Sequence, residues 1–511
     1  MKKLHILFLC LIVGITVNAQ EVDRSKFIKD SLDIYINKAL TDWRIPGAAV
    51  AIVKDGKIIL MKGYGIKELG LPGKVDANTL FMIGSNTKAF TATALAMLQA
   101  EKKLSLDEKV TKYIPEFKLE NKAAGEMATV KDLLSHRLGF RTFQGDFTFY
   151  NTNLSRHEVI ERLGRLKATY PFRTTWGYTN AAFLTAGEII PRVTGKQWET
   201  YLKENIFAPL GMNNTLALTA EMPKALNRSV PHTLVDGRLT AIPYCNIDGL
   251  APAGSISSSA SDMSKWVMAL LDNGKVGGKQ VIPAAAIAAT RQPQDYVGSV
   301  EHLSGETGFQ LYGLGWFLQN YKGRRLVMHD GGVSGYVSSV TLVPEEKLGI
   351  VILTNTDKND FFETLRWDIL DAMFKNKNYH YNDTYLKYEQ TNTTQFRAID
   401  KKMRDSTLLN LKPELSPGKY TGKYVNDFYG SLEITQGEKN NELEIRFEHH
   451  PKMFANLQPL GGNRFYVTFS DPVLGKAIFP FFVKDGKVTG LRVKVADFVE
   501  YGSYDFRKVE K

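Results

Sequence analysis

The stretch Ile83-Gly84-Ser85-Asn86-Thr87-Lys88 leads directly into the Ala/Leu-rich run Ala89-Phe90-Thr91-Ala92-Thr93-Ala94-Leu95-Ala96-Met97-Leu98. This run predicts a well-buried helix that begins near Ser85. Because positions i and i+3 share one helix face, the Ser85 hydroxyl and the Lys88 amine can meet. A serine hydroxyl needs an adjacent base, and a lysine can be that base when burial or a nearby cation lowers its pKa. The helix N-terminus adds N–H groups where an oxyanion would form, so the stretch indicates acyl transfer through a serine ester.

Ser-x-x-Lys is a short pattern, and a purely structural interpretation competes with the catalytic one. Ser416-Pro417-Gly418-Lys419 also matches it, but this turn composition would not hold both side chains on one helix face. Taken alone, a helix cap at Ser85 with a solvated Lys88 is the better explanation. The catalytic interpretation therefore depends on partners elsewhere in the chain.

A first partner motif is Tyr178-Thr179-Asn180, just before the small-residue run 181–187, which is expected to be helical. A phenol near one or two lysines can lose its proton well below pH 10, which suits a base or a proton relay. Tyr244-Cys245-Asn246 fits the same pattern and remains the runner-up. An ordinary buried aromatic with a bonded hydroxyl is the structural alternative for Tyr178.

A second partner motif is His329-Asp330-Gly331-Gly332, which predicts a strand edge followed by a glycine-rich approach to a second strand at 337–343. Glycines there let a substrate come close to the backbone. The Gly332 N–H is then a candidate for the second oxyanion donor beside the Ser85 N–H. A lone His329 is more often structural, but its glycine context favours a functional role.

In their order and rough spacing, these three motifs resemble those of serine β-lactamases and penicillin-binding proteins, in the class C-like branch that includes esterases, D-amino-acid peptidases and acyltransferases. The resemblance covers roughly residues 25 to 375. Further segments that carry it are Ile45–Val53, Asp132–Gly139, Pro252–Ser259 and Tyr312–Trp316.

The resemblance implies roles for the motif residues. Ser85 is then the acylated nucleophile, Lys88 its activating base, and Tyr178 the shuttle that brings a proton to the leaving group. It also implies that Asn180 holds the acyl chain, with Gly331 and Gly332 on the oxyanion and substrate-binding side.

The chain departs from the family pattern at His329. Penicillin-recognising members carry there the lysine of a Lys-Thr/Ser-Gly motif, and neither Lys-Thr-Gly nor Lys-Ser-Gly occurs in this chain. A lysine offers a fixed positive charge to a substrate carboxylate, whereas a histidine is mostly neutral at pH 7. The departure disfavours efficient β-lactam hydrolysis and favours esterase, amidase or acyl-transfer activity. Arg173 also stands where a Pro-Gly pair is usual, and it is expected to be a surface residue more than a contact to an anionic substrate.

The N-terminus predicts a secretory signal over residues 1–19, with Lys2 and Lys3, an apolar core, and cleavage after Ala19. The apolar core is too short to span a membrane, and no later stretch reaches that length. We therefore expect a secreted or periplasmic protein. The mature chain keeps one cysteine, Cys245, expected to be a buried small hydrophobe.

The formal net charge is +11, and removing the two signal lysines leaves +9. The basic residues are scattered, so we interpret them as solvated surface and expect no nucleic-acid partner. No Gly-x-Ser-x-Gly, His-Glu-x-x-His or phosphate-binding Gly-x-x-x-x-Gly-Lys-Ser/Thr motif occurs, and the chemistry needs no cofactor. Glu448-His449-His450 is expected to be a solvated loop and not part of a metal site.

Two domains are expected in a chain of 511 residues. Residues 20–375 predict an α+β domain in which an antiparallel sheet is flanked by helices, together with a helical subdomain. Residues 376–414 are expected to be a connector, helical from about 391 to 408. Residues 415–511 predict a small all-β barrel, similar to the lipocalin-like C-terminal domain of some family members, where such a domain covers the active site or joins subunits into a homo-oligomer.

We therefore predict a secreted serine hydrolase that cleaves an ester or amide carbonyl of a small molecule or peptide through a Ser85 acyl-enzyme. An acyltransferase that passes the acyl group to an alcohol or amine is one alternative. A non-catalytic protein that binds or senses an acyl ligand is the alternative from another class. The retained set of Ser85, Lys88 and Tyr178 favours the enzyme, because a binder needs none of this machinery.

Overall fold

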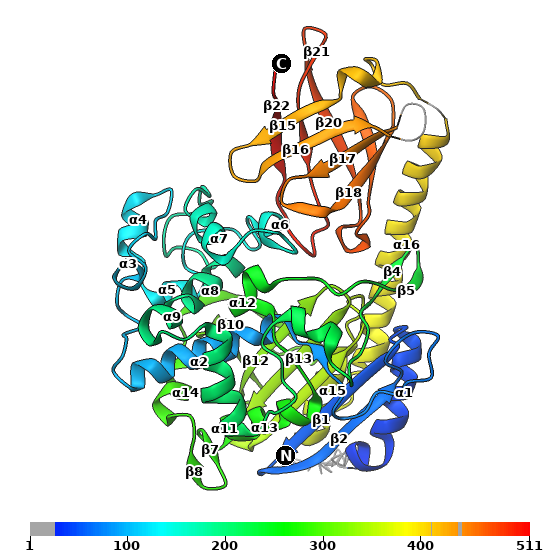
Figure 1. Cartoon of the computed structure of the whole chain (residues 1–511). Helices are drawn as coiled ribbons and strands as arrows, with labels where there is room; N and C mark the ends of the chain where they lie inside the picture. The colour runs from blue at the N-terminus through cyan, green and yellow to red at the C-terminus, as the bar shows by residue number, and fades with distance from the viewer. Residues whose placement is uncertain (1–25, 410, 438–441, 511) are drawn as a thin grey trace, which may run out of the picture.

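The computed structural model describes residues 26–409, 411–437 and 442–510. Its centre is an antiparallel sheet of eight strands in the order β2-β1-β14-β13-β12-β11-β10-β9 (Figure 1). The strands are β1 Gly47–Lys54, β2 Lys57–Gly65, β9 Asp295–Glu301, β10 Thr307–Tyr312, β11 Phe317–Tyr321, β12 Arg324–Val333, β13 Tyr336–Val343 and β14 Leu348–Thr354. The expected combination of an antiparallel sheet with flanking helices is confirmed.

The sheet joins the two ends of this domain, because the N-terminal hairpin β1–β2 pairs with the late strand β14. Asp55 and Gly56, both at positive φ, make the turn of that hairpin as the Asp-Gly pair predicts. Strand β1 is buried on both faces. Ala49, Ala51 and Val53 belong to one hydrophobic core, and the alternate residues Ala48, Val50 and Ile52 belong to another.

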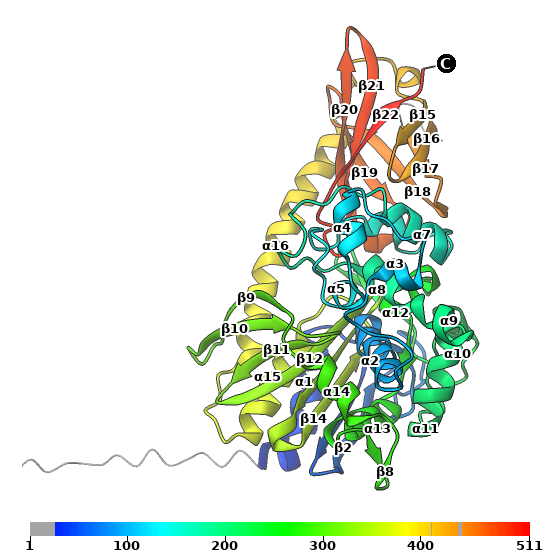
Figure 2. The same ribbon diagram turned by 90° about the vertical axis from the view of Figure 1, so that its left-hand side faces the viewer.

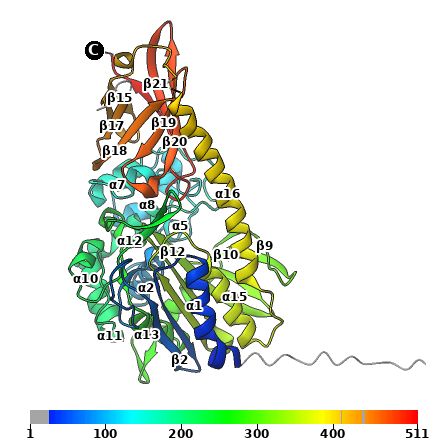
Figure 3. The same ribbon diagram turned by 90° about the vertical axis from the view of Figure 1, so that its right-hand side faces the viewer.

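Helices cover both faces of the sheet. On one face lie α1 Leu32–Asp42, preceded by a π-helical turn Phe27–Ser31, and α15 Phe361–Met373 (Figure 3). On the other face lie α2 Thr87–Ala100, α13 Ala260–Leu271 and α14 Ala284–Thr290. Helix α2, which follows the Ser85 turn, is buried along almost its whole length, as its Ala/Leu composition predicts.

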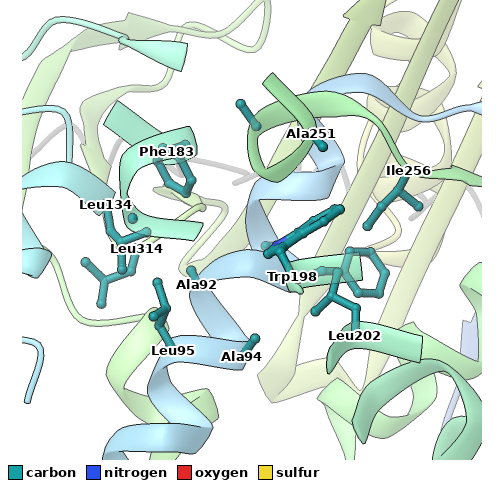
Figure 4. Close-up of a cluster of buried hydrophobic side chains, with 14 of the residues drawn as sticks. Ala92, Ala94, Leu95, Leu134, Phe183, Trp198, Leu202, Ala251, Ile256 and Leu314 are labelled. Carbon is teal, nitrogen blue, oxygen red and sulfur yellow. The ribbon is translucent and has the colours of Figure 1, made fainter. Parts of the chain in front are cut away.

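The helical subdomain packs around α2. Trp198, Leu202, Phe183 and Ala251, which come from three helices of this subdomain, lie around α2 in the hydrophobic cluster that also contains Ala92 and Leu95 (Figure 4). Its helices are α3 Val110–Tyr113, α4 Lys122–Met127, α5 Val130–Leu134, α6 Asp146–Phe149, α7 Arg156–Leu163, α8 Asn180–Gly187, α9 Ile189–Thr194, α10 Trp198–Leu202, α11 Ala208–Leu210 and α12 Ala251–Gly254. Two-residue strands β3 Phe81–Met82 and β6 Ser257–Ser258 pair beside the Ser85 turn, and the hairpins β4 His232–Val235 with β5 Arg238–Ala241 and β7 Lys275–Val276 with β8 Lys279–Gln280 complete the domain.

A single long helix, α16 Tyr381–Leu408, leads from the sheet domain to the C-terminal strands (Figure 2). It starts about one-third of its length earlier than the helix expected from residue 391, because Tyr381 is anchored in the sheet-side core by a hydrogen bond between its hydroxyl and that of Tyr321. This tertiary contact is invisible to local sequence pattern.

The C-terminal strands close into a barrel of eight strands, which confirms the expected all-β barrel. They are β15 Gly422–Asn426, β16 Gly430–Gln436, β17 Leu443–Phe447, β18 His450–Pro459, β19 Arg464–Phe469, β20 Lys476–Lys484, β21 Lys487–Val493 and β22 Tyr504–Lys508. Phe147 of the helical subdomain is part of the barrel's hydrophobic core. The two units therefore share packed side chains in addition to the connecting helix.

The predicted signal at residues 1–19 lies outside the described residues. In the part of the chain that the structure describes, no helix has the length and apolar character needed to cross a membrane.

Candidate active site

Ser85 and Lys88 lie on one face of the turn that opens α2. Ser85 belongs to a 3-10 turn, Gly84–Asn86, which continues without interruption into the helix. Lys88 Nζ lies 3.0 Å from Ser85 Oγ. The i,i+3 spacing thus brings the two side chains together, as the sequence predicts.

The Lys88 amine is enclosed by acceptors. Its Nζ lies 2.7 Å from Asn180 Oδ1 and 2.8 Å from the Ala253 carbonyl oxygen, and its side chain is fully buried. Burial holds the pKa of Lys88 well below its usual value, while the nearby Asp146 carboxylate opposes that shift. A neutral amine has two N–H donors and one lone pair. The two carbonyl oxygens can take the donors, which leaves the lone pair for the Ser85 hydroxyl.

Tyr178 lies against the same amine, with Lys88 Nζ 4.6 Å from the centre of its ring. Burial raises the pKa of Tyr178, and a hydrogen bond to Ser85 offsets only part of that rise. The expectation that neighbouring lysines would let this phenol ionise well below pH 10 is therefore wrong for this site. The phenol remains protonated at neutral pH and is equipped to donate a proton.

The β12–β13 hairpin brings its glycines to the Ser85 turn. A Cβ on Gly331 would lie 2.0 Å from the Ile83 carbonyl oxygen, and one on Gly84 would lie 3.0 Å from the Gly332 nitrogen. Only residues without a side chain allow so close an approach of backbones. The Gly332 N–H is consequently next to the residue that precedes Ser85, where a second oxyanion donor is needed.

His329 lies in the same hairpin and is joined to two residues that had no role in the sequence interpretation, Tyr312 and His136. Tyr312 Oη lies 3.2 Å from His329 Nε2 and 3.3 Å from His136 Nε2. The only sequence signal for them is that His136 lies in Asp132–Gly139 and Tyr312 in Tyr312–Trp316, two of the segments that resemble the family.

The other partners of the two histidines determine which atom donates in each hydrogen bond of the chain His136–Tyr312–His329. His136 Nδ1 accepts the Thr179 N–H, so its Nε2 carries a proton and donates to Tyr312. The Tyr312 hydroxyl then donates to His329 Nε2, while His329 Nδ1 donates to the Asp330 carbonyl oxygen at 2.6 Å. Burial and the Lys88 charge lower the pKa of His329 to about 4, so it is neutral at pH 7.

A carboxyl group also missed by the sequence interpretation lies behind Asn180. Asn180 Nδ2 donates to Asp146 Oδ2 at 2.6 Å, while its Oδ1 faces Lys88. Burial raises the pKa of Asp146 to about 7. Its position at the first residue of α6 follows no motif, so no local pattern marks it.

A loop of the barrel between β21 and β22 reaches over this site. Phe498 in that loop lies within 3.4 Å of the point where a Cβ of Gly332 would be. The Tyr501 ring lies tilted against Phe143 at 5.5 Å between ring centres, and the Phe143 ring meets Tyr178 edge-on at 5.6 Å. The barrel thus supplies aromatic side chains next to the oxyanion side and next to the phenol.

The competing motifs lie elsewhere. Tyr244 donates its hydroxyl to the Ser229 carbonyl oxygen, and Ser416 precedes the turn Pro417–Lys419 near the barrel. Arg173 is exposed, as expected of a surface residue, and it forms a two-point ion pair with the buried Asp132. It holds the segment before Tyr178 in place and does not face the serine.

His449 and His450 are not a solvated loop, and that expectation is wrong. Both are buried where the barrel meets the helical subdomain. His450 Nδ1 lies 2.6 Å from the Tyr429 hydroxyl, and His449 Nε2 lies 2.8 Å from Arg162. No group of three or more metal-ligating side chains occurs among the described residues. Cys245 is buried, as expected of a small hydrophobe.

Several known proteins are similar to this chain. The family model described as Beta-lactamase matches residues 32–373. The chain is 28% identical over 436 residues to the unguisins hydrolase ungD' of Aspergillus campestris, covering 80% of this chain and 78% of that protein. It is 27% identical over 329 residues to protein flp of Staphylococcus aureus, covering 64% and 63%.

Two solved structures share the fold. The octameric penicillin-binding protein homologue from Pyrococcus abyssi superposes with a TM-score of 0.61 at 23% identity, covering 93% of this chain and 99% of that one. The D-stereospecific amidohydrolase from Streptomyces sp. superposes with a TM-score of 0.54 at 20% identity, covering 69% and 98%.

Proposed function

The chain belongs to the Beta-lactamase family and is a hydrolase of that kind, and from this premise we propose that it cleaves an ester or amide bond through an acyl-enzyme on Ser85. One observation carries the proposal. The fully buried Lys88 amine lies 3.0 Å from Ser85 Oγ and has carbonyl acceptors for both of its N–H groups. A binding protein gains nothing from a buried amine with a lowered pKa beside a serine.

Acylation begins when the neutral Lys88 amine takes the Ser85 proton as Oγ bonds to the substrate carbonyl carbon. The carbonyl oxygen becomes an oxyanion that the N–H groups of Ser85 and Gly332 stabilise. The bond to the leaving group then breaks. Tyr178, which burial keeps protonated, donates its proton to the departing oxygen or nitrogen and recovers one from the Lys88 ammonium. Water repeats the sequence on the acyl-enzyme and releases the acid.

The neutral His329 defines the substrate class further. Burial and Lys88 hold the pKa of His329 at about 4, so at pH 7 the site offers no fixed positive charge at that position. A substrate carboxylate is therefore not a required recognition element. We propose esters or amides without a carboxylate next to the scissile bond as preferred substrates, with weak turnover of β-lactams.

The relatives' names support an amide or ester carbonyl, since one is called a hydrolase and one solved structure an amidohydrolase. Transfer of the acyl group to an alcohol or amine uses the same steps with another acceptor. Export through the signal at 1–19 and self-association through the barrel remain predictions.

The test is a substrate panel with matched variants. We expect wild-type protein to hydrolyse p-nitrophenyl acetate and D-alanine p-nitroanilide, and Ser85→Ala to lose on the order of 10⁶-fold in rate. The matched control Ser416→Ala, at the other Ser-x-x-Lys motif, keeps the wild-type rate. Equal rates for wild type and Ser85→Ala would contradict the proposal. If the wild type turns over no substrate and Ser85→Ala binds a ligand with unchanged affinity, a binding protein would be favoured.

A further inference from the structure

A buried carboxyl group, Asp146, lies behind the pair formed by Lys88 and Asn180. Its side chain is 4% exposed, and its Oδ2 accepts a 2.6 Å hydrogen bond from Asn180 Nδ2. Its Oδ1 has no hydrogen-bond partner among the described residues. Asp146 does not contact Ser85 or Lys88 by any hydrogen bond that the structure contains, so it can act on them only through Asn180 or through its charge.

Asp146 determines which end of the Asn180 amide faces Lys88. The two ends of an asparagine amide are almost identical in shape, but one donates hydrogen bonds and the other accepts them. The carboxylate accepts from the NH₂ end, and this holds the oxygen end 2.7 Å from Lys88 Nζ. Turned the other way, the amide would offer Lys88 a donor, and that donor would compete with Ser85 for the lone pair.

The amide direction decides where the Lys88 lone pair points. With Asn180 Oδ1 and the Ala253 carbonyl oxygen each accepting one N–H, the remaining position on the neutral amine faces Ser85 Oγ at 3.0 Å. If the amide turned, one N–H of Lys88 would lose its acceptor. The amine would then rotate away from the serine.

The barrel holds Asp146 in this place. The Glu500 carboxylate, in the loop between β21 and β22, accepts the backbone N–H groups of Gly145 at 2.9 Å and Phe147 at 3.0 Å. These residues flank Asp146 on both sides. The Phe147 ring also stacks on His450 of the barrel at 5.0 Å between ring centres. The backbone that carries Asp146 is thus fixed from the C-terminal unit.

We propose that Asp146 is a positioning residue, held by Glu500 of the barrel, that acts through the Asn180 amide to aim the lone pair of Lys88 at Ser85. The inference rests on the proposed serine-hydrolase function. It assigns the barrel a part in the chemistry through one defined path: Glu500, the α6 backbone, Asp146, Asn180, Lys88.

The experiment compares Asp146→Ala with Asp146→Asn, whose side-chain oxygen can still accept from Asn180. The readouts are kcat and KM for p-nitrophenyl acetate and the rate at which a fluorophosphonate labels Ser85, each between pH 5 and 10. We expect Asp146→Ala to lower kcat about 10- to 100-fold with KM within about threefold, and Asp146→Asn to recover most of the loss. Asp262→Asn removes a buried carboxylate of α13 whose partners are Asn214, Thr215 and Lys265 and none of the site residues, and it serves as the control for destabilisation alone.

The pH profile distinguishes the effect of the Asp146 charge on Lys88 from its effect on the orientation of the Asn180 amide. Above its own pKa, which burial raises to about 7, Asp146 is a carboxylate that raises the pKa of Lys88 against its burial, so its removal shifts the acid limb to lower pH. Every variant keeps the other titratable groups around Lys88. These are Tyr178, His136, His329 and, beyond Asp146, Glu500. We expect the shifted limb in Asp146→Asn and an unshifted limb in Asp262→Asn.

A double variant tests the path through Asn180. Because Asp146 acts through this amide, Asp146→Ala added to Asn180→Ala should cost little beyond Asn180→Ala alone. Losses of kcat that add up in the double variant would overturn the inference. So would an Asp146→Ala variant with the kcat and the acid limb of the wild type. An Asp146→Asn variant as slow as Asp146→Ala would overturn it as well. If Asp146→Ala does not fold, an unshifted limb in Asp146→Asn overturns it. Absence of labelling on wild-type Ser85 would instead overturn the proposed function, and the inference with it.

Discussion

Gly84 and Gly332 meet backbone to backbone: a Cβ on Gly84 would lie 3.0 Å from the Gly332 nitrogen and 2.9 Å from its carbonyl oxygen. Gly84 adopts a positive φ of 50°, so this position disfavours a side chain for two reasons. The contact joins the start of α2 to the β12–β13 hairpin. It thereby brings the two N–H groups proposed as oxyanion donors to one place.

The neighbouring glycines of that hairpin should respond differently to alanine. A Cβ on Gly331 would lie 2.0 Å from the Ile83 carbonyl oxygen, whereas one on Gly332 meets only the Phe498 ring at 3.4 Å. We expect Gly331→Ala to displace the hairpin from Ser85 and lower kcat for p-nitrophenyl acetate by about 10²-fold or more. Gly332→Ala keeps its N–H and should stay within about tenfold of wild type. The same loss in both variants would argue against this steric account.

Lys88 should set the acid limb of the pH profile. A base must be neutral to accept the Ser85 proton, so activity rises as pH rises through the lowered pKa of Lys88 and is lost below it. In Lys88→Met this limb disappears, and kcat falls about 10²- to 10⁴-fold. Measuring p-nitrophenyl acetate hydrolysis from pH 5 to 10 in both proteins checks the prediction. An unchanged limb in Lys88→Met would assign the titration to another group.

Tyr178 should matter most for poor leaving groups. Its phenol stays protonated because burial raises its pKa, so its proposed task is to donate a proton to the departing atom. A p-nitrophenolate leaves without protonation, but an amine does not. We expect Tyr178→Phe to lower kcat about 10²-fold more for D-alanine p-nitroanilide than for p-nitrophenyl acetate. Equal losses on the two substrates would point to a positioning role only.

Tyr312 should contribute to stability as the link between two buried histidines. Tyr312→Phe removes the hydroxyl that lies 3.2 Å from His329 Nε2 and 3.3 Å from His136 Nε2, and it leaves both ring nitrogens without that partner. Unpaired buried polar groups cost about 1–3 kcal/mol each. We expect urea denaturation to show a loss of stability of about that size, and Tyr113→Phe, near the surface of the helical subdomain, to show much less. A loss in Tyr312→Phe no larger than in the control would contradict the assigned hydrogen-bond chain.

Features that depend on residues close together in the sequence could be predicted from the sequence. Ser85 and Lys88 are three residues apart on one helix, so their meeting follows from helix geometry. Likewise, the Asp-Gly turn between β1 and β2 and the alternating strands of the barrel follow from short-range pattern. The antiparallel sheet with flanking helices and the C-terminal barrel could both be predicted in this way, whereas the β-lactamase-like family was predicted from the resemblance of the ordered motifs.

The missed features depend on contacts between distant residues. Asp146 reaches Asn180 across 34 positions, and Tyr312 reaches His136 across 176. His449 and His450 look polar in sequence but are buried because a second unit packs on them. Burial likewise reversed the expected pKa shift of Tyr178, since the cost of placing a phenolate in the interior exceeds what its neighbours offset.

The most direct test of the account is intact-protein mass spectrometry after exposure to a fluorophosphonate, with wild type and Ser85→Ala compared at pH 8. The account predicts one covalent adduct on the wild type, located at Ser85 by peptide mapping, and none on the variant. No adduct on folded wild-type protein, or an adduct that persists in Ser85→Ala, would contradict the claim that Ser85 is the activated nucleophile.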